Sequence, residues 1–104
     1  MWFAANLLFK SVHIPSGKRP PIWEQSIRLI EAETEADARG KAERLGKSEM
    51  VSYQARSDLV IWTFEGVERV YAIEKDHLSD GVELYSRFLR DAEVTSMRTP
   101  FDDE

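Results

Sequence analysis

The two histidines and the lack of cysteine limit the metal chemistry open to this chain. His13 and His77 lie far apart, and neither has a second histidine at ligand spacing. Asp76 and Asp80 flank His77, but a metal site needs three or four converging ligands. Because the chain has no cysteine, disulfides, thiolate metal sites and cysteine nucleophiles are excluded. We therefore interpret the segment around His77 as a polar turn and expect no metal site and no cofactor.

Ser16-Gly17-Lys18 invites comparison with a phosphate-binding loop. Such a loop needs a glycine five positions before its Gly-Lys pair, and a serine or threonine after the lysine. Val12 and Arg19 occupy those two positions. We therefore interpret this segment as a solvated basic loop.

Glu31 and Glu33 are two carboxylates two residues apart, so they point the same way from a predicted strand and could act as an acid and a base. Two carboxylates that share a proton can divide those roles. The same residues lead into a predicted helix after Thr34, where negative charge is favoured by the helix dipole. We favour this second interpretation.

Three tryptophans are many for 104 residues, and they could wall a pocket or anchor an interface. Trp62 stands between two apolar residues of one strand face, so we expect it in the core. Trp2 and Trp23 begin predicted strands, and pairing of these strands could make them near neighbours at the rim of a site. Glu24, Glu65 and Arg87 are polar residues that adjoin the sequence motifs described below, and we add them as candidates for the same site. The candidate binding residues are Trp2, Trp23, Glu24, Glu65 and Arg87.

The first predicted strand, residues 2–9, alternates as a strand does but is apolar on both faces. Such a strand is central and covered twice, or it is covered by a partner. Residues 11–21 contain three prolines and a glycine and predict a long loop. The second strand, at about residues 22–33, has one apolar and one polar face.

The clearest local prediction is a helix over about residues 35–45. Thr34 is placed to cap it, with Asp37 in the capping-box position. Alanines at helical spacing give a narrow apolar face that should lie close against the sheet. Gly46 follows where a left-handed C-cap belongs.

Further strands are predicted after the helix. Gly66 interrupts a strand pattern, so either two hairpin-connected strands or one bent strand fits. Asp80-Gly81 has turn chemistry, which favours a last strand over residues 82–89; the alternative is a second helix over about residues 82–91. The strand ranges are 50–55, 59–64, 67–73 and 82–89.

These elements predict an α+β fold, with an antiparallel sheet of four to six strands and one helix on one face, in the order β-β-α-β-β-β. Residues 1–90 would form a single domain. Residues 91–104 are polar and are predicted to be a loosely held tail.

The charge pattern bears on partners and location. Net charge is −5, and the basic residues are spread among acids without a stripe. We therefore expect no binding to nucleic acid or to an anionic membrane. No segment approaches the ~20 apolar residues of a membrane helix, and the N-terminus lacks the basic region of a signal peptide. We expect a cytoplasmic protein.

Several short motifs spread along the chain are specific in combination. They are Trp2-Phe3-Ala4-Ala5-x-Leu7-Leu8-Phe9, Trp23-Glu24 with Ile27-x-Leu29-Ile30-Glu31-Ala32, Ala38 with Lys41-Ala42-Glu43, Trp62-x-Phe64-x-Gly66-Val67 with Val70-Tyr71, and Asp80-Gly81-x-Glu83-x-Tyr85-Ser86-Arg87. Together they resemble a small, mostly bacterial family of uncharacterised proteins, a domain of unknown function. The resemblance covers roughly residues 2–89. It implies a stand-alone bacterial cytoplasmic domain and supplies no catalytic residue.

Two hypotheses of function follow. The first is a non-catalytic protein-interaction domain that self-associates as a homodimer, because the first strand is apolar on both faces and reactive groups are few. The alternative is a small-molecule binder or hydrolase-like enzyme with a Trp-walled pocket. That alternative requires Trp2 or Trp23 to meet at least two of the three polar candidates in one concave site.

Overall fold

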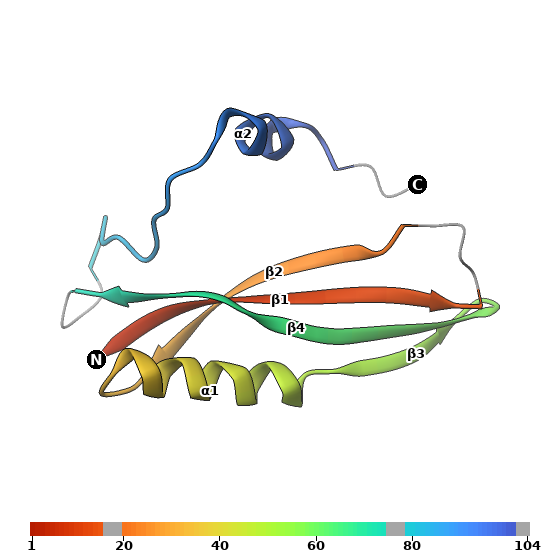
Figure 1. Ribbon diagram of the computed structural model, residues 1–104, viewed down its shortest axis with the longest axis horizontal. Coiled ribbons are helices and arrows are strands. Elements are labelled where there is room, and N and C mark those ends of the chain that lie inside the picture. Colours follow the sequence, from red (N-terminus) through yellow and green to blue (C-terminus); the bar gives the residue numbers. More distant parts are fainter. Residues whose placement is uncertain (16–19, 75–78, 102–104) are drawn as a thin grey trace.

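The computed structural model describes residues 1–15, 20–74 and 79–101. Four strands form one antiparallel sheet in the order β2-β1-β4-β3. Helix α1 covers one face, while the C-terminal segment with α2 lies on the opposite side (Figure 1). The elements are β1 (Trp2–Ile14), β2 (Ile22–Glu31), α1 (Glu35–Ser48), β3 (Val51–Ala55), β4 (Asp58–Ile73) and α2 (Asp91–Arg98).

The α+β class and the antiparallel sheet are as predicted, but the predicted order and number of helices were wrong. The described elements run β-β-α-β-β and end in a second helix. The sheet has four strands, the lower limit of the predicted range.

Strand β1 lies between β2 and β4, and its faces are apolar because α1 covers one side of the sheet and the C-terminal segment crosses the other (Figure 1). One alternate set of its side chains points toward α1 and forms the main core. Fully burying a Leu or Phe side chain contributes roughly 1.5–3 kcal/mol, so this row is a main source of stability. The buried residues of the core between α1 and the sheet are Phe3, Ala5, Leu7, Phe9, Ile30, Ala32, Ala38, Ala42 and Val70.

The predicted loop over residues 11–21 was too long at its first end. Strand β1 continues to Ile14, because it pairs with β4 as far as Leu59, whereas its pairing with β2 ends at Ser11 and Ile22. The Ser16-Gly17-Lys18 motif lies outside the described residues, as do Asp76 and His77.

Helix α1 begins as predicted. The Thr34 hydroxyl accepts a hydrogen bond from the backbone N–H of Asp37 at 3.1 Å, which satisfies one of the open donors of the first turn. The helix runs one turn further than predicted, to Ser48, and Gly46 lies inside it, so Gly46 is not the C-cap. Gly46 is buried, and a Cβ atom there would overlap the ring of Phe64. Its role is close approach of the helix to the sheet.

An ion pair holds the end of α1 to β2. Both terminal nitrogens of Arg28 donate to Glu49, at 2.7 and 2.6 Å, and Arg28 Nε donates to Ser26 at 2.6 Å. Glu49 is the C-cap residue, where a negative charge is unfavourable beside the helix carbonyls. The hydrogen bond from Arg28 holds the pKa of Glu49 below its ordinary value and raises the pKa of Arg28.

Strand β4 is continuous over 16 residues, so Gly66 does not divide two strands. Its pairing with β1 shifts register twice, between Asn6 and Leu7 and between Leu8 and Phe9. Gly66 lies between the two bulges with φ of 132°, a conformation that favours glycine. The bend of the strand is thus built from two bulges rather than from a turn.

The strand predicted over residues 82–89 was wrong, and so was the alternative helix over 82–91. Residues 82–90 belong to neither element type in the structure. The segment contacts the face of the sheet through side chains instead of pairing with an edge. Helix α2 begins only at Asp91, and none of its residues is buried.

Two negative findings apply to residues 1–15, 20–74 and 79–101. No helix among them is long and apolar enough to cross a membrane. No group of three or more His, Cys, Asp or Glu side chains among them is placed to hold a metal ion.

Candidate functional site

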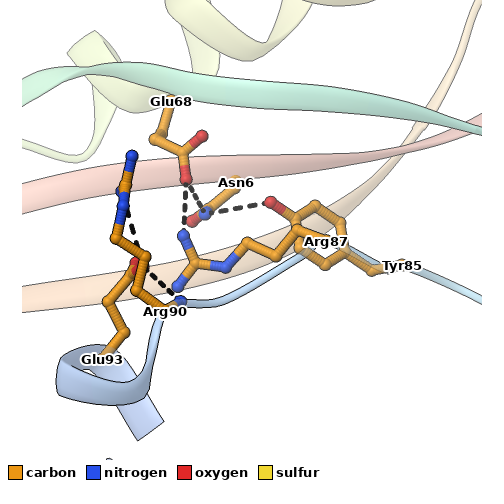
Figure 2. Close-up of polar contacts among 6 residues, drawn as sticks. All are labelled: Asn6, Glu68, Tyr85, Arg87, Arg90 and Glu93. Carbon is orange, nitrogen blue, oxygen red and sulfur yellow. Dashed lines mark hydrogen bonds and ion pairs between the residues drawn. The ribbon is translucent and has the colours of Figure 1, made fainter. Parts of the chain in front are cut away.

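The C-terminal segment crosses the sheet face opposite α1 above a small polar cluster (Figure 2). Asn6, fully buried in β1, lies at its centre. Asn6 Nδ2 donates to Glu68 Oε1 at 3.1 Å and lies 3.5 Å from the hydroxyl oxygen of Tyr85. Arg87 Nη1 donates to the same Glu68 oxygen at 3.4 Å. Two side chains of the C-terminal segment are thereby tied to β1 and β4. We call these four residues the polar clasp.

The first bulge of β4 places Glu68 in the clasp. Asn6 pairs with Arg69 while Leu7 pairs with Val67, so Glu68 is the extra residue between them. A bulge changes the direction in which a side chain points. Here it brings a carboxylate to 3.1 Å from the Nδ2 atom of the buried Asn6 amide, closer than the Tyr85 hydroxyl at 3.5 Å.

An aromatic contact extends the clasp toward the end of β4. The rings of Tyr71 and Tyr85 lie 5.9 Å apart at 56°, a favourable tilted geometry. The guanidinium carbon of Arg69 lies 5.8 and 5.7 Å from their centroids. Hydrogen bonds from Ser86 and Tyr71 lower the pKa of the Glu83 carboxyl. The beginning of the C-terminal segment is thus held by several side chains at once.

The geometry of the clasp positions the chain. The carboxylate of Glu68 is engaged by an amide and a guanidinium. A general base must instead be free to take a proton from a bound group. Asn6 Oδ1 is buried without a hydrogen-bond partner in the described part of the chain, so it is an unsatisfied polar atom within the clasp.

Beside the clasp, the outer strand β2 carries an apolar stripe on the same face of the sheet. The stripe consists of Trp23, Ile27 and Leu29, which are 52%, 50% and 49% exposed. Leu84 borders a small apolar hollow of about 160 Å³ next to Ile27 and Leu29. The C-terminal segment therefore reaches one end of the stripe and leaves the rest open.

The two candidate tryptophans lie at opposite ends of the β1–β2 hairpin. Trp2 pairs with Glu31, whereas Trp23 pairs with Lys10. Eight residues of strand separate these positions, which is about 26 Å. Pairing of the first two strands thus keeps the tryptophans apart, contrary to the prediction. Lys10 Nζ lies 5.4 Å from the Trp23 ring centroid, a cation–π contact.

The three polar candidates lie at separate places. Glu24 is on the α1 face of the sheet, opposite Phe9, and Glu65 is exposed at the second bulge, where it accepts a hydrogen bond from Thr63 at 2.8 Å. Arg87 alone belongs to the clasp. Among the described residues, the five candidates do not come together, and no Trp-walled pocket forms around them.

Sequence reasoning did not single out Asn6 and Glu68, and it used Tyr85 only as part of a family motif. Asn6 did carry a usable signal, because an amide in a strand apolar on both faces must find a buried partner. Glu68 carried none, since its position depends on a bulge that the strand pattern does not reveal.

These features define the chain as an α+β domain whose sheet is covered by a helix on one face and crossed by its own C-terminal segment on the other. The domain of unknown function DUF4288 matches residues 2–86. The chain belongs to this family. The match stops before Arg87, so α2 lies beyond it. Comparison with curated proteins and with solved structures found no match.

Proposed function

We propose that this protein is a non-catalytic interaction domain that associates with a second copy of itself. The observation that carries the proposal is its exposed surface. The chain exposes 8000 Å², whereas a folded monomer of 12.0 kDa exposes about 6,000 Å². The radius of gyration, 16.5 Å, likewise exceeds the roughly 13 Å of a compact domain of this length.

Part of the exposed surface is apolar and lies on the side of the sheet opposite α1 (Figure 1). The stripe on β2 is half exposed, and Phe88, Met97 and Phe101 of the C-terminal segment are more exposed still. Apolar side chains gathered at one face are typical of an interface, unlike single apolar residues scattered over a surface. This arrangement supports association through the face opposite α1.

The setting that we propose is the bacterial cytoplasm, without nucleic acid or membrane as a partner. Its support is the net charge of −5 and the lack of cysteine, both of which suit a protein–protein role in a reducing compartment.

Sedimentation equilibrium of the full chain at micromolar concentration tests the proposal. The expected mass is twice the 12.0 kDa of one chain. Ile27→Asp should shift the protein toward monomer, because it places a charge in the stripe. Val51→Asp is the matched control: Val51 is equally exposed, at 53%, but it lies at the other edge of the sheet on the α1 face. A wild-type protein that stays monomeric would contradict the proposal.

A further inference from the structure

We infer that two copies exchange their C-terminal arms, so that α2 of each copy lies on the apolar stripe of the other. The arm is residues 88–101, the part of the chain that follows the clasp. This inference rests on the proposed self-association and specifies the surfaces that form it.

Helix α2 is the first part of the argument. It contacts neither a strand nor α1, and none of its eight residues is buried. Figure 1 shows it standing away from the sheet. Isolated helices shorter than about 12–15 residues are marginal in water. A helix of this length therefore needs a surface to pack on, and in the described structure it is packed on no strand or helix of its own chain.

The arm carries the side chains that such packing requires. Phe88 is fully exposed, Met97 is 69% exposed and Phe101 is 76% exposed. The helix start is already fixed, since the Glu93 carboxylate accepts a hydrogen bond from the backbone N–H of Arg90 at 2.9 Å, as a capping box does. The arm thus combines a defined helix with apolar residues that lack a partner.

The clasp determines where the arm leaves the sheet. Arg87 is held to Glu68, and only three residues separate it from the first residue of α2. The four residue steps from Arg87 to Asp91 span at most about 14 Å, so α2 must begin close to the clasp. Because the base of the arm is already fixed, docking of its outer part loses less conformational entropy.

The matching surface is the stripe. It lies on the same face as the clasp, on a strand whose outer edge pairs with no strand of the described chain. Ile27 and Leu29 occupy neighbouring positions on this face of β2, and Trp23 lies on the same face beyond the exposed Gln25. A short amphipathic helix laid across the stripe buries both apolar surfaces.

A second copy is the occupant that satisfies both unmatched surfaces together. Each chain has one unpacked arm and one uncovered stripe, so a two-fold axis makes two identical contacts and leaves neither surface open. The exposed area in excess of a compact monomer is about 2,000 Å² per chain. A standard interface needs about 800 Å² per partner, and an obligate dimer more. The excess is therefore large enough for a stable exchanged dimer.

Cross-linking between chains with single introduced cysteines tests the exchange. The natural sequence has no cysteine, so a thiol reagent reports only on the introduced positions. Ile27→Cys and Met97→Cys chains, carrying different tags, are refolded together and treated with a short bis-maleimide. We expect a covalent dimer that contains both tags. Val51→Cys replaces Ile27→Cys in the control mixture, which should yield at least about tenfold less product.

The outcomes separate the exchange from the self-association on which it rests. A wild-type protein that is monomeric by sedimentation overturns both. A dimer in which Ile27→Cys gives no more product than Val51→Cys overturns the exchange alone. A doubly substituted single chain (Ile27→Cys with Met97→Cys) that cross-links within itself, while the mixed chains do not, shows that the arm folds back on its own sheet and also overturns the exchange.

Discussion

Asn6 determines the position of the C-terminal segment through a side chain that is costly to bury. A buried polar group without partners costs about 1–3 kcal/mol, and Asn6 Oδ1 has none in the described residues. Its NH2 group, in contrast, reaches Glu68 and Tyr85. An apolar residue would fill the same place in the strand without specifying where the segment lies. We therefore interpret Asn6 as a residue that gives specificity at some expense of stability.

Asn6→Asp keeps the shape of the side chain but places a second carboxylate beside Glu68. We expect a loss of about 1–3 kcal/mol in the free energy of unfolding at pH 7, because a buried carboxylate at position 6 would lie at hydrogen-bond distance from the Glu68 carboxylate, which is 34% exposed and therefore partly screened by solvent. The repulsion raises the pKa of the carboxyl pair in the folded state. The penalty is therefore greatest above that pKa and is relieved as the pH falls through it.

Urea unfolding at pH 7 and pH 5 measures this effect. Addition of Glu68→Gln to Asn6→Asp removes one charge and should restore most of the loss at pH 7. Equal stability of Asn6→Asp and the natural protein at pH 7 would contradict the contacts of the clasp.

The Arg28–Glu49 pair predicts a pH dependence of the opposite sign. The pKa of Glu49 is lowered in the folded state, so the pair stabilises above the ordinary pKa of 4.5 and the effect is lost as the pH falls through the lowered value. Both side chains are partly exposed, at 30% and 37%, which limits the effect of Glu49→Gln to about 0.5–1 kcal/mol at pH 7. The difference from wild type should shrink in urea unfolding below pH 4.5.

Glu43→Gln serves as the control for that experiment. Glu43 is an exposed residue of the same helix, and no ion pair involves it among the described residues. Its substitution should leave the free energy of unfolding within about 0.5 kcal/mol of wild type. A pH-independent loss in Glu49→Gln would mean that the ion pair does not contribute.

At the scale of the element, two glycines of α1 should respond to alanine with opposite signs. Gly46→Ala sends a methyl group into the Phe64 ring, and overpacking of this kind costs about 1–3 kcal/mol. At Gly40 the nearest atom to an added Cβ is the end of the flexible Arg44 side chain, at 3.5 Å. Gly40→Ala should therefore stabilise by about 0.5–1 kcal/mol through helix propensity. Thermal unfolding of the two variants checks both signs, and destabilisation by Gly40→Ala or a neutral Gly46→Ala would be inconsistent with this packing.

Helices and strands could be predicted from the sequence where the residues that determine them are close together in the chain. The start of α1 follows from Thr34 and Asp37 alone, and the central place of β1 follows from its two apolar faces. The end of α1 was missed because Gly46 has two possible roles, a cap or a close contact, and only the position of Phe64 distinguishes them. Tertiary contacts outweigh the local pattern there.

The prediction for residues 82–89 failed for a related reason. Alternating apolar residues indicate a strand only where an edge is available for pairing. This segment lies across a sheet face, and side chains such as Tyr85 and Arg87 hold it there. Arg87 could be chosen from the sequence, but its partner Glu68 could not, because a register shift in β4 brings the two together.

In the whole molecule, the two faces of the sheet are buried to different extents. Helix α1 buries the larger core on one side of the sheet. The other side is held by the clasp at one end, and the stripe on β2 remains half exposed. If a second copy covers this face, as we propose, the stability of the fold depends on the protein concentration.

Coupling of association to folding predicts a concentration-dependent melting temperature. For a native dimer that unfolds to separate chains, each tenfold rise in protein concentration adds about 1.4 kcal/mol per dimer. For a folding unit of two chains this corresponds to a rise of about 3–6 °C. Differential scanning calorimetry over roughly two decades of protein concentration, beginning in the low micromolar range, measures how the melting temperature rises with concentration. Phe88→Asp should flatten it, because the charge removes an apolar side chain of the arm, whereas Val51→Asp should keep it. A melting temperature independent of concentration would mean that the open face of the sheet is stable without a second copy.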